Sequence, residues 1–407
     1  MKLFDDLLYR GLIQDVSDKS LEEKLNNGGM TFYWGTDPSG ESLHIGHYVS
    51  LLIAERLRRA GHHPILLVGG ATGLVGDPRP NSERPMITKE LLNFNYESIK
   101  KQINSLFKFD MVNNYDWSKE INFIDYLRDY GKYFSVNYML NKDTVKSRLD
   151  IGITYTEFSY MIMQSLDFLY LFEHNNCTMQ IGGSDQWGNI TSGIELIRKK
   201  TNKEAYGFTT PLMLKADGTK FGKSEGKAIW LDINKTSAYE MYQFFINSED
   251  EKVIEYLKKL TFLTKEEIDV FEIKQKEHPE KREAAKMLAK EVITFLHKDE
   301  EYQKAIKISE ILFDGNIKEL TKEELNDAFK NFNSYDINTN INIVELLVKA
   351  GIATSNRDAR ELILNNSIKI NGDIVNNIDE IITKDKALNN LIIIRKGKKK
   401  YFVIKYI

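Results

Sequence analysis

The sequence predicts an α/β protein whose main domain is a doubly wound parallel sheet. Residues 31–35 form a short strand-like run, followed by a Gly/Pro turn and a helical pattern over 48–60 that Gly61 ends. Residues 64–68 form a second run that is apolar throughout, as expected for a strand buried on both faces, and lead into the glycine-rich stretch 69–78. Strand, helix, strand and glycine-rich turn succeed one another as in a doubly wound fold.

The composition bounds the class of protein. The chain has 407 residues, of which 42% are hydrophobic and 28% charged, and this fits two or three domains with a sizeable core. The net charge of −3 does not by itself indicate a nucleic-acid partner. One cysteine and seven histidines, without ligand spacing, exclude a disulfide framework and predict no metal site. We expect a cytoplasmic protein without membrane contact, because the sequence shows neither a signal peptide nor a membrane-spanning apolar run.

The start of the first helix is a candidate phosphate site. A helix N-terminus presents unpaired N–H groups and a partial positive charge. His44 and His47 are three residues apart and share one face of the first turn, and Gly46 between them allows a ligand to approach the backbone. Two imidazoles there can donate hydrogen bonds to phosphate oxygens that gain charge during a reaction. The plainer interpretation is an ordinary helix start with two surface histidines.

A second stretch carries two lysines in a loop without apolar periodicity. Residues 217–224, Asp-Gly-Thr-Lys-Phe-Gly-Lys-Ser, contain Lys220, Lys223 and Ser224. Such a loop can close over a triphosphate and neutralise the charge that moves onto pyrophosphate. Exposed lysine loops are common, so this stretch alone is weak evidence.

A polar stripe crosses the apolar helix expected from Thr156, its N-cap, to about residue 170. Tyr160, Gln164 and Asp167 lie at spacings of four and seven and share one face. Apolar residues crowd the rest of the helix, so the stripe is more consistent with a small-ligand pocket than with a solvated face.

Another strand, Gly-Gly turn and helix start follow at residues 178–189. Asp185 beside Gly183 suits the hydroxyl groups of a ribose. Residues 201–216 hold one more strand, which leads into the lysine loop.

Residues 86–160 interrupt the alternation of strands and helices. We expect an insertion with helices near 88–106, 120–130 and 141–150. Its many aromatic residues form either a local core or a subunit interface, where aromatic residues are enriched.

The remainder divides into a helical part and a basic module. Charged amphipathic helices cover 236–330, a polar Asn-rich stretch at 331–340 reads as a linker, and residues 341–407 hold two helices and hairpins. The last 67 residues contain 12 Lys+Arg and seven Asp+Glu, a balance of +5 that leaves −8 for the rest. This asymmetry indicates RNA contact rather than a solvated tail. The candidate RNA-binding residues are Arg357, Arg360, Arg395, Lys396, Lys398, Lys399 and Lys400.

The paired stretches resemble those of a known family. His44-Ile45-Gly46-His47 matches the HIGH signature of class I aminoacyl-tRNA synthetases, and residues 220–224 resemble their KMSKS loop in the form found in the tyrosyl branch. The likeness to bacterial-type tyrosyl-tRNA synthetases extends over essentially the whole chain, including an S4-like RNA-binding module at 341–407. The resemblance implies a Rossmann-like catalytic domain at 1–235 whose insertion at 86–160 makes a homodimer contact, and an anticodon-side helical domain at 236–330.

The resemblance also implies roles for residues at matching positions. Tyr33 and Asp167 would bind the substrate phenol. The α-ammonium group would be held by Tyr160, Gln164 and Asp77; the alternative role of Asp77 is that of a turn or helix cap. Gln180 would assist in the amino-acid pocket, and Gln186 would lie near the substrate carboxylate. Asp185 and Gly183 would hold the ribose, with His47 in the same region, and Ser39 and His44 would meet the γ-phosphate. The departing pyrophosphate would be stabilised by Lys220, Lys223, Ser224 and Arg84.

We therefore expect a tyrosine–tRNA ligase with L-tyrosine, ATP and tRNA(Tyr) as substrates. Its carboxylate substrate is already the nucleophile, so positioning and charge stabilisation suffice, and Mg2+ would arrive with ATP rather than as part of a tightly bound cofactor. One departure from the family is Trp34, where a small residue is usual. The alternatives are a tryptophanyl enzyme of the sister branch and an RNA-binding protein that has lost catalysis.

Overall fold

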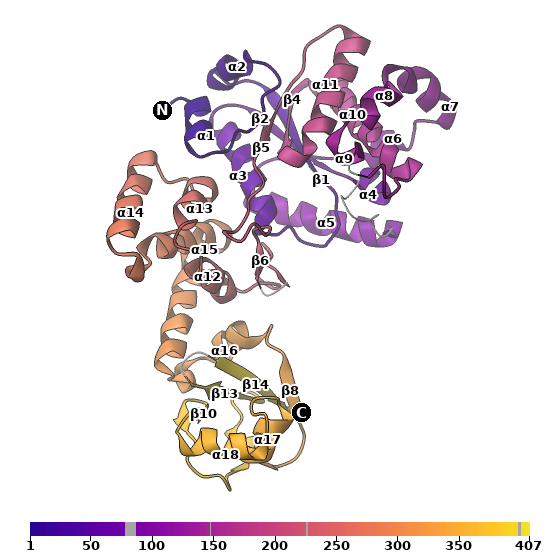
Figure 1. Ribbon diagram of the computed structural model, residues 1–407. Helices are drawn as coiled ribbons and strands as arrows, with labels where there is room; N and C mark the ends of the chain where they lie inside the picture. The colour runs from indigo at the N-terminus through magenta and orange to yellow at the C-terminus, as the bar shows by residue number, and fades with distance from the viewer. Residues whose placement is uncertain (78–86, 147, 225–226, 398–399) are drawn as a thin grey trace. The chain divides into compact units, whose positions relative to one another are not determined.

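The computed structural model describes residues 1–77, 87–146, 148–224, 227–397 and 400–407 (Figure 1). These residues form two compact units. The first comprises Met1–Lys235 with Ser248–Leu288, and the second comprises Thr236–Asn247 with Ala289–Ile407.

A five-stranded parallel sheet organises the first unit. Its strands run in the order β3 (Asp110–Asn113), β2 (His63–Val68), β1 (Thr31–Thr36), β4 (Cys177–Gly183) and β5 (Tyr206–Thr210). The strand order reverses between β1 and β4, and ligands bind beyond the carboxyl ends of strands at such a switch point. The predicted doubly wound α/β fold is therefore confirmed.

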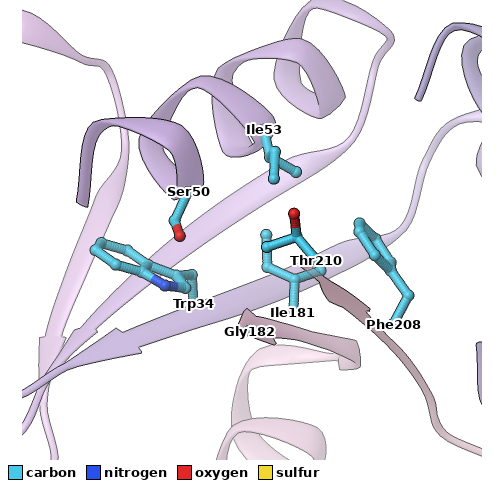
Figure 2. Close-up of a pocket in the computed structure, with 7 residues that line it drawn as sticks. All are labelled: Trp34, Ser50, Ile53, Ile181, Gly182, Phe208 and Thr210. Carbon is cyan, nitrogen blue, oxygen red and sulfur yellow. The ribbon is translucent and has the colours of Figure 1, made fainter. Parts of the chain in front are cut away.

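Helices cover both faces of this sheet. Helix α3 (Ile45–Arg59) lies over the face that Trp34 enters, and Figure 2 shows the indole ring beneath it. Tyr33, the preceding residue on β1, points to the opposite face, where its ring lies 5.3 Å from that of Phe168 on α10 (Tyr155–Asn175). Helix α11 (Trp187–Thr201) lies alongside α10 (Figure 1). The side chains of Tyr33 and Trp34, which are neighbours on β1, thus lie on opposite faces of the sheet.

Smaller elements complete the first unit. Helices α1 (Leu3–Tyr9), α2 (Leu21–Asn27) and α4 (Thr72–Val75) surround the first strands. The expected helix at 88–106 is α5 (Lys89–Leu106). The other elements of the insertion are α6 (Tyr115–Ser118), α7 (Phe123–Asp125), a π-helical turn (Tyr126–Tyr130), a 3-10 turn (Gly131–Tyr133), α8 (Val136–Leu140) and α9 (Asp143–Lys146).

Two sequence-based expectations were wrong here. Strand β3 joins the edge of the sheet although it lies within the expected insertion; its Met111-Val112 pair is too short an apolar run to stand out. Helix α10 begins at Tyr155, and its N-cap is Thr154 rather than Thr156, because the Thr154 hydroxyl accepts the Glu157 N–H at 3.3 Å.

The amphipathic helices of the middle region form where their periodicity predicts. Helices α13 (Val253–Leu260) and α14 (Lys265–Glu277) belong to the first unit, and α12 (Ala238–Ile246) and α16 (Lys322–Phe329) to the second. Helix α15 (Glu283–Asp314) is kinked at Lys298, whose φ is 74°.

The C-terminal sheet has the order β11-β10-β13-β14-β8. Strand β8 (Ser334–Ile337) pairs in parallel with β14 (Lys400–Tyr406), so this part of the stretch expected to be a linker belongs to the sheet. This edge strand is exposed on one side and therefore contains polar residues, so the sequence has no apolar run by which to recognise it. The other elements are β9 (Ile341–Asn342), α17 (Ile343–Lys349), α18 (Asn356–Leu364), β10 (Ile368–Ile370), β11 (Asp373–Ile374), β12 (Ile381–Ile382) and β13 (Leu391–Lys396).

None of the helices in the described residues is long and apolar enough to cross a membrane.

Candidate functional site

The N-terminus of α3 is capped by the two predicted histidines. The His44 Nδ1 accepts the N–H of Gly46 at 3.0 Å, and the His47 Nδ1 accepts the N–H of His44 at 3.2 Å. The two rings stack with their centroids 3.9 Å apart. A neutral imidazole that accepts through Nδ1 carries its proton on Nε2, so both rings are arranged as Nε2 donors.

The protonation state of His47 follows from its surroundings. Burial first, and then neighbouring His44, lower the pKa of His47 to about 3. A neutral His47 offers a hydrogen bond without carrying a positive charge near neutral pH. The sequence placed both residues in the first turn, but it could not show that the His44 ring caps the backbone of Gly46 and the His47 ring that of His44.

The lysine loop adjoins this N-terminus directly. A Cβ added to Gly222, whose φ is +97°, would lie 2.8 Å from Ile45 Cγ2 and 3.2 Å from the Gly46 nitrogen. The backbone N–H of Ile45 donates to the Ile229 carbonyl at 2.8 Å, and that of Ile229 donates to the Gly222 carbonyl at 3.0 Å. Gly222 is therefore required both for its left-handed conformation and for the close approach. The structure thus brings the two signatures together.

The structure describes three of the four residues predicted to bind pyrophosphate. Lys220 is exposed and forms a backbone bridge with Leu214. Lys223 and Ser224 form β6 (Lys223–Ser224), which pairs with β7 (Lys227–Ala228). Arg84 lies outside the described residues.

A cluster of buried polar side chains lies on the opposite face of the sheet. Tyr33 and Gln180 are register partners on β1 and β4, and both are buried. The Tyr33 hydroxyl and the Gln180 Oε1 are enclosed, and neither has a hydrogen-bond partner among the described residues. Burial and then the charge of Asp167 raise the pKa of Tyr33 well above its usual value, so the phenol stays protonated. Unpaired buried polar atoms are costly, and a polar ligand would satisfy them.

Asp167 is held in this cluster by two donors. The Asn114 Nδ2 donates to one carboxylate oxygen at 2.9 Å, and the Trp117 Nε1 donates to the other at 2.8 Å. Burial raises the pKa of Asp167 to about 7, against the two hydrogen bonds, which lower it, while the charge of Asp37 raises it further. Asp167 is therefore close to the midpoint of its titration near neutral pH.

Tyr160 reaches a partner that the sequence did not predict. Its hydroxyl donates to Asp37 Oδ2 at 3.2 Å, and the Thr72 hydroxyl donates to the other oxygen of the same carboxylate at 2.8 Å. Asn114 also donates to the Thr72 hydroxyl at 3.0 Å. A continuous chain of hydrogen bonds thus joins Asp37 to Asp167.

A second network gathers three further predicted residues. The Gln186 Nε2 donates to Asp77 Oδ2 at 2.9 Å. The Asn189 Nδ2 donates to both Gln186 Oε1 and Gln164 Oε1, each at 3.0 Å. Asp77, Gln164 and Gln186 come from three separate elements, and Asn189 on α11 links them.

The remaining predicted positions surround the switch point. Asp185 is exposed and folds over Gly183, where an added Cβ would lie 2.6 Å from Asp185 Oδ1. Ser39 is exposed, and its N–H donates to the Asp37 carbonyl at 2.8 Å.

Trp34 fills the space between α3 and the sheet. Figure 2 shows its ring below Ser50, in a pocket also lined by Ile53, Ile181, Gly182, Phe208 and Thr210. Its centroid lies 6.3 Å from that of His47. The indole therefore contributes to the apolar surroundings of the α3 N-terminus.

The comparisons with known proteins decide the family. The sequence model of the family described as tRNA synthetases class I (W and Y) matches residues 25–314. The chain belongs to this family. A second model, for the tyrosine–tRNA ligase SYY-like C-terminal domain, matches residues 324–404 of the synthetase.

Full-length relatives agree with this assignment. The chain is 50% identical to tyrosine–tRNA ligase 1 of Bacillus licheniformis over 417 residues, 99% of each chain. It is 49% identical to tyrosine–tRNA ligase of Streptococcus mutans over 418 residues and the whole of both chains.

Solved structures share the fold. A C-terminally truncated mitochondrial tyrosyl-tRNA synthetase from Aspergillus nidulans superposes with a TM-score of 0.68 at 30% identity, over 77% of this chain and 94% of that one. A tryptophanyl-tRNA synthetase from Encephalitozoon cuniculi, bound to tryptophan, has a TM-score of 0.56 at 16% identity, over 79% and 89% of the chains. The second likeness concerns the fold alone.

The basic residues of the C-terminal module fall into two groups. Arg357 and Arg360 on α18, and Lys400 on β14, are exposed. Arg395 instead donates to the Leu312 and Phe313 carbonyls at the end of α15, and Lys396 donates to the Ile352 carbonyl at 2.7 Å. These two side chains have a structural role that charge counting could not reveal. Lys398 and Lys399 lie outside the described residues.

Sequence reasoning missed five side chains that organise the site. Four of them follow a strand or begin a helix, which is where a doubly wound sheet places functional groups. Their position in the sequence could therefore have identified them as candidate site residues. The fifth, Trp117, was treated only as one of many aromatic residues. The five are Asp37, Thr72, Asn114, Trp117 and Asn189.

In the parts of the chain that the structure describes, no three His, Cys, Asp or Glu residues are grouped so that they could hold a metal ion.

Proposed function

We propose that this synthetase activates L-tyrosine with ATP and transfers it to tRNA(Tyr). The observation that carries the proposal is the buried Tyr33 hydroxyl beside Asp167, for which the described part of the chain supplies no hydrogen-bond partner. A substrate phenol would accept a hydrogen bond from Tyr33 and donate one to Asp167. Tryptophan has a single indole donor and no acceptor, and would leave Tyr33 unpaired.

The other end of the amino acid would meet the second network. We assign its α-ammonium group to Asp77, Gln164 and Tyr160, since a carboxylate with amide and hydroxyl oxygens suits a cation. Gln186 would lie near the substrate carboxylate, and Gln180 would complete the pocket wall with its unpaired Oε1.

Adenylate formation would take place between the two signatures. The tyrosine carboxylate attacks the α-phosphorus of ATP, a new phosphorus–oxygen bond forms, and pyrophosphate leaves with the electrons of the broken bond. The α3 N-terminus, with Gly46 and the Nε2 donors of His44 and His47, would face the phosphates. Asp185 and Gly183 would hold the ribose, Ser39 would help to bind the γ-phosphate, and Lys220, Lys223, Ser224 and Arg84 would stabilise departing pyrophosphate. We infer that Mg2+ accompanies ATP.

The second half-reaction would use the C-terminal module. Arg357, Arg360 and Lys400 are exposed and would contact tRNA phosphates, as would Lys398 and Lys399. Because Arg395 and Lys396 already donate to carbonyl groups, we expect a smaller contribution from them. Transfer to tRNA also supports a cytoplasmic location, where tRNA and ATP are present.

A homodimer is the assembly that we infer. Large apolar side chains of the insertion are exposed although a folded monomer rarely leaves so many in one segment. They are Phe123, Ile124, Leu127, Val136, Tyr138, Leu149, Ile151 and Tyr155.

One assay tests the proposed reaction and its alternatives. Exchange of labelled pyrophosphate into ATP is measured with each amino acid in turn, using the full chain. Exchange with tyrosine alone supports the proposal. Exchange that depends on tryptophan would indicate the sister activity, and tRNA binding without any exchange would indicate an RNA-binding protein.

A further inference from the structure

Helix α13 carries a buried tyrosine, Tyr256, that contacts both arms of the lysine hairpin, the turn at residues 213–222 that contains Lys220. The ring of Tyr256 lies 4.5 Å from that of Phe221, and its hydroxyl donates to the Leu214 carbonyl at 3.3 Å. Leu214 and Lys220 form a bridge across the hairpin, and the Phe221 N–H donates to the Met213 carbonyl at 3.1 Å. One side chain therefore contacts the strand that enters the lysine loop and the strand that leaves it.

Helix α13 is itself fixed to the helix that bears the histidines. Two buried arginines reach it: Arg10 donates to the carbonyls of Lys258 at 2.8 Å and Leu263 at 2.6 Å, and Arg56 of α3 donates to the Thr261 carbonyl. The Arg56 guanidinium also lies 4.7 Å from the centre of the Phe262 ring. The C-terminal end of α13 is thus tied to α3, whose N-terminus adjoins Gly222.

These contacts give the loop a rigid support. Lys220 is exposed and itself forms the backbone bridge with Leu214, while the next residue, Phe221, is 6% exposed against Tyr256. A lysine that stabilises a leaving group must be held within a fraction of an ångström of its place, and the residues that support it decide that precision.

We propose that Tyr256 is a positioning residue for adenylate formation, which holds the lysine hairpin against the N-terminus of α3. The inference rests on the proposed role of Lys220. Tyr256 does not touch the phosphates; its ring orients Phe221, and its hydroxyl fixes Leu214. Its loss affects the step in which pyrophosphate departs, and spares both tyrosine binding on the opposite face of the sheet and transfer from adenylate to tRNA, in which no pyrophosphate leaves.

The test compares Tyr256→Leu and Tyr256→Phe in the full chain. Adenylate formation is followed by stopped-flow fluorescence, tyrosine affinity by equilibrium dialysis, and transfer to tRNA by single-turnover quench. We expect Tyr256→Leu, which removes the contact between the two tilted rings and the hydrogen bond, to slow adenylate formation about tenfold, and Tyr256→Phe about threefold. Tyrosine affinity and transfer should remain within about twofold of the parent. The matched control is Ile268→Ala, a buried residue of α14, which should leave the three values unchanged after correction for the folded fraction.

A double variant separates positioning from a general packing role. If Tyr256 acts through the loop, Tyr256→Leu should add less than about twofold to the defect of Lys220→Ala. Full additivity, or an equal fall in adenylate formation, tyrosine affinity and transfer, would overturn the proposal. So would a parental rate for Tyr256→Leu while Lys220→Ala is slow. If Lys220→Ala itself reacts as the parent does, the assigned role of the loop fails and this inference with it.

A second measurement tests the proposal even if Tyr256→Leu folds poorly, because it uses Tyr256→Phe. Amide hydrogen exchange at residues 213–222 should increase several-fold in Tyr256→Phe, with exchange in β1 and β4 unchanged. Unchanged exchange in the hairpin would contradict the proposal.

Discussion

The Asn114 side-chain amide donates a hydrogen bond of 2.9 Å to the buried Asp167 carboxylate, which lies beside Tyr33. The Trp117 indole binds the other carboxylate oxygen, and both donors favour the ionised form. Burial outweighs them and raises the pKa of Asp167 to about 7. Asp167 is thus an acceptor whose charge depends on small changes around it.

The first prediction concerns stability against pH. The ordinary pKa of this carboxyl group is 3.8, so between about pH 4 and pH 7 the folded chain retains a proton that the unfolded chain has lost. The free energy of unfolding should therefore fall as the pH rises through this window, by up to ~4 kcal/mol for about three pKa units. Urea unfolding at pH 5 and pH 8 checks this. Asp167→Asn should lose this part of the pH dependence, and an unchanged dependence in that variant would contradict the assignment.

The second prediction concerns Asn114. Asn114→Ala removes a hydrogen bond that lowers the pKa of Asp167 and should raise that pKa by about one unit. The rising limb of kcat/KM for tyrosine against pH, which reports the free enzyme, should shift to higher pH by the same amount. Asn247→Ala, at an exposed helix end, is the control. A shift of equal size in the control would show that the profile does not report Asp167.

The sequence predicted the catalytic fold because its strands are apolar and its turns contain glycine. It also placed Tyr33, Gln180 and Asp167 in one pocket through the resemblance and the helical stripe. It could not place Asn114 or Trp117, because the distance between them and Asp167 is set by the packing of α6 against α10 and not by any local pattern.

The third prediction concerns specificity. Tyr33→Phe removes the hydroxyl that has no partner among the described residues. Tyrosine should then bind about tenfold or more weakly, whereas phenylalanine, which would otherwise leave that hydroxyl unpaired, should gain relative to tyrosine. Pyrophosphate exchange with both amino acids gives the ratio. If the ratio stays at the parental value, the phenol does not lie at Tyr33.

The fourth prediction concerns the lysine loop. A group that engages pyrophosphate mainly in the transition state lowers kcat when removed, with little effect on ground-state binding. Lys223→Ala should therefore slow adenylate formation by about a hundredfold and leave tyrosine affinity unchanged. Stopped-flow measurement decides, and exposed Lys227→Ala on the paired strand β7 is the control.

The C-terminal module shows the limit of charge counting. The excess of positive charge predicted an RNA contact at residues 341–407, yet Arg395 caps the end of α15 and Lys396 binds a backbone carbonyl. In addition, Leu325 and Phe329 of α16 share one core with Ile393 and Val403 of the sheet. Removing the module by ending the chain near Tyr335 would expose this core. Charge reversal on the intact chain is therefore a cleaner test of tRNA binding by the module than truncation.

The fifth prediction therefore reverses Arg357 and Arg360 to Glu together. Both side chains are exposed on α18, so the fold should be preserved, while two attractions to phosphate become repulsions. We expect tRNA affinity to fall by at least about tenfold and the slope of log affinity against log salt to become shallower by roughly two. Exchange of pyrophosphate into ATP should stay within about twofold of the parent, since that reaction needs no tRNA. Reversal of Lys276 and Lys281, two exposed cations outside the module, controls for the change in net charge. An equal loss of tRNA affinity in the control would mean that overall charge, and not the α18 surface, holds the tRNA.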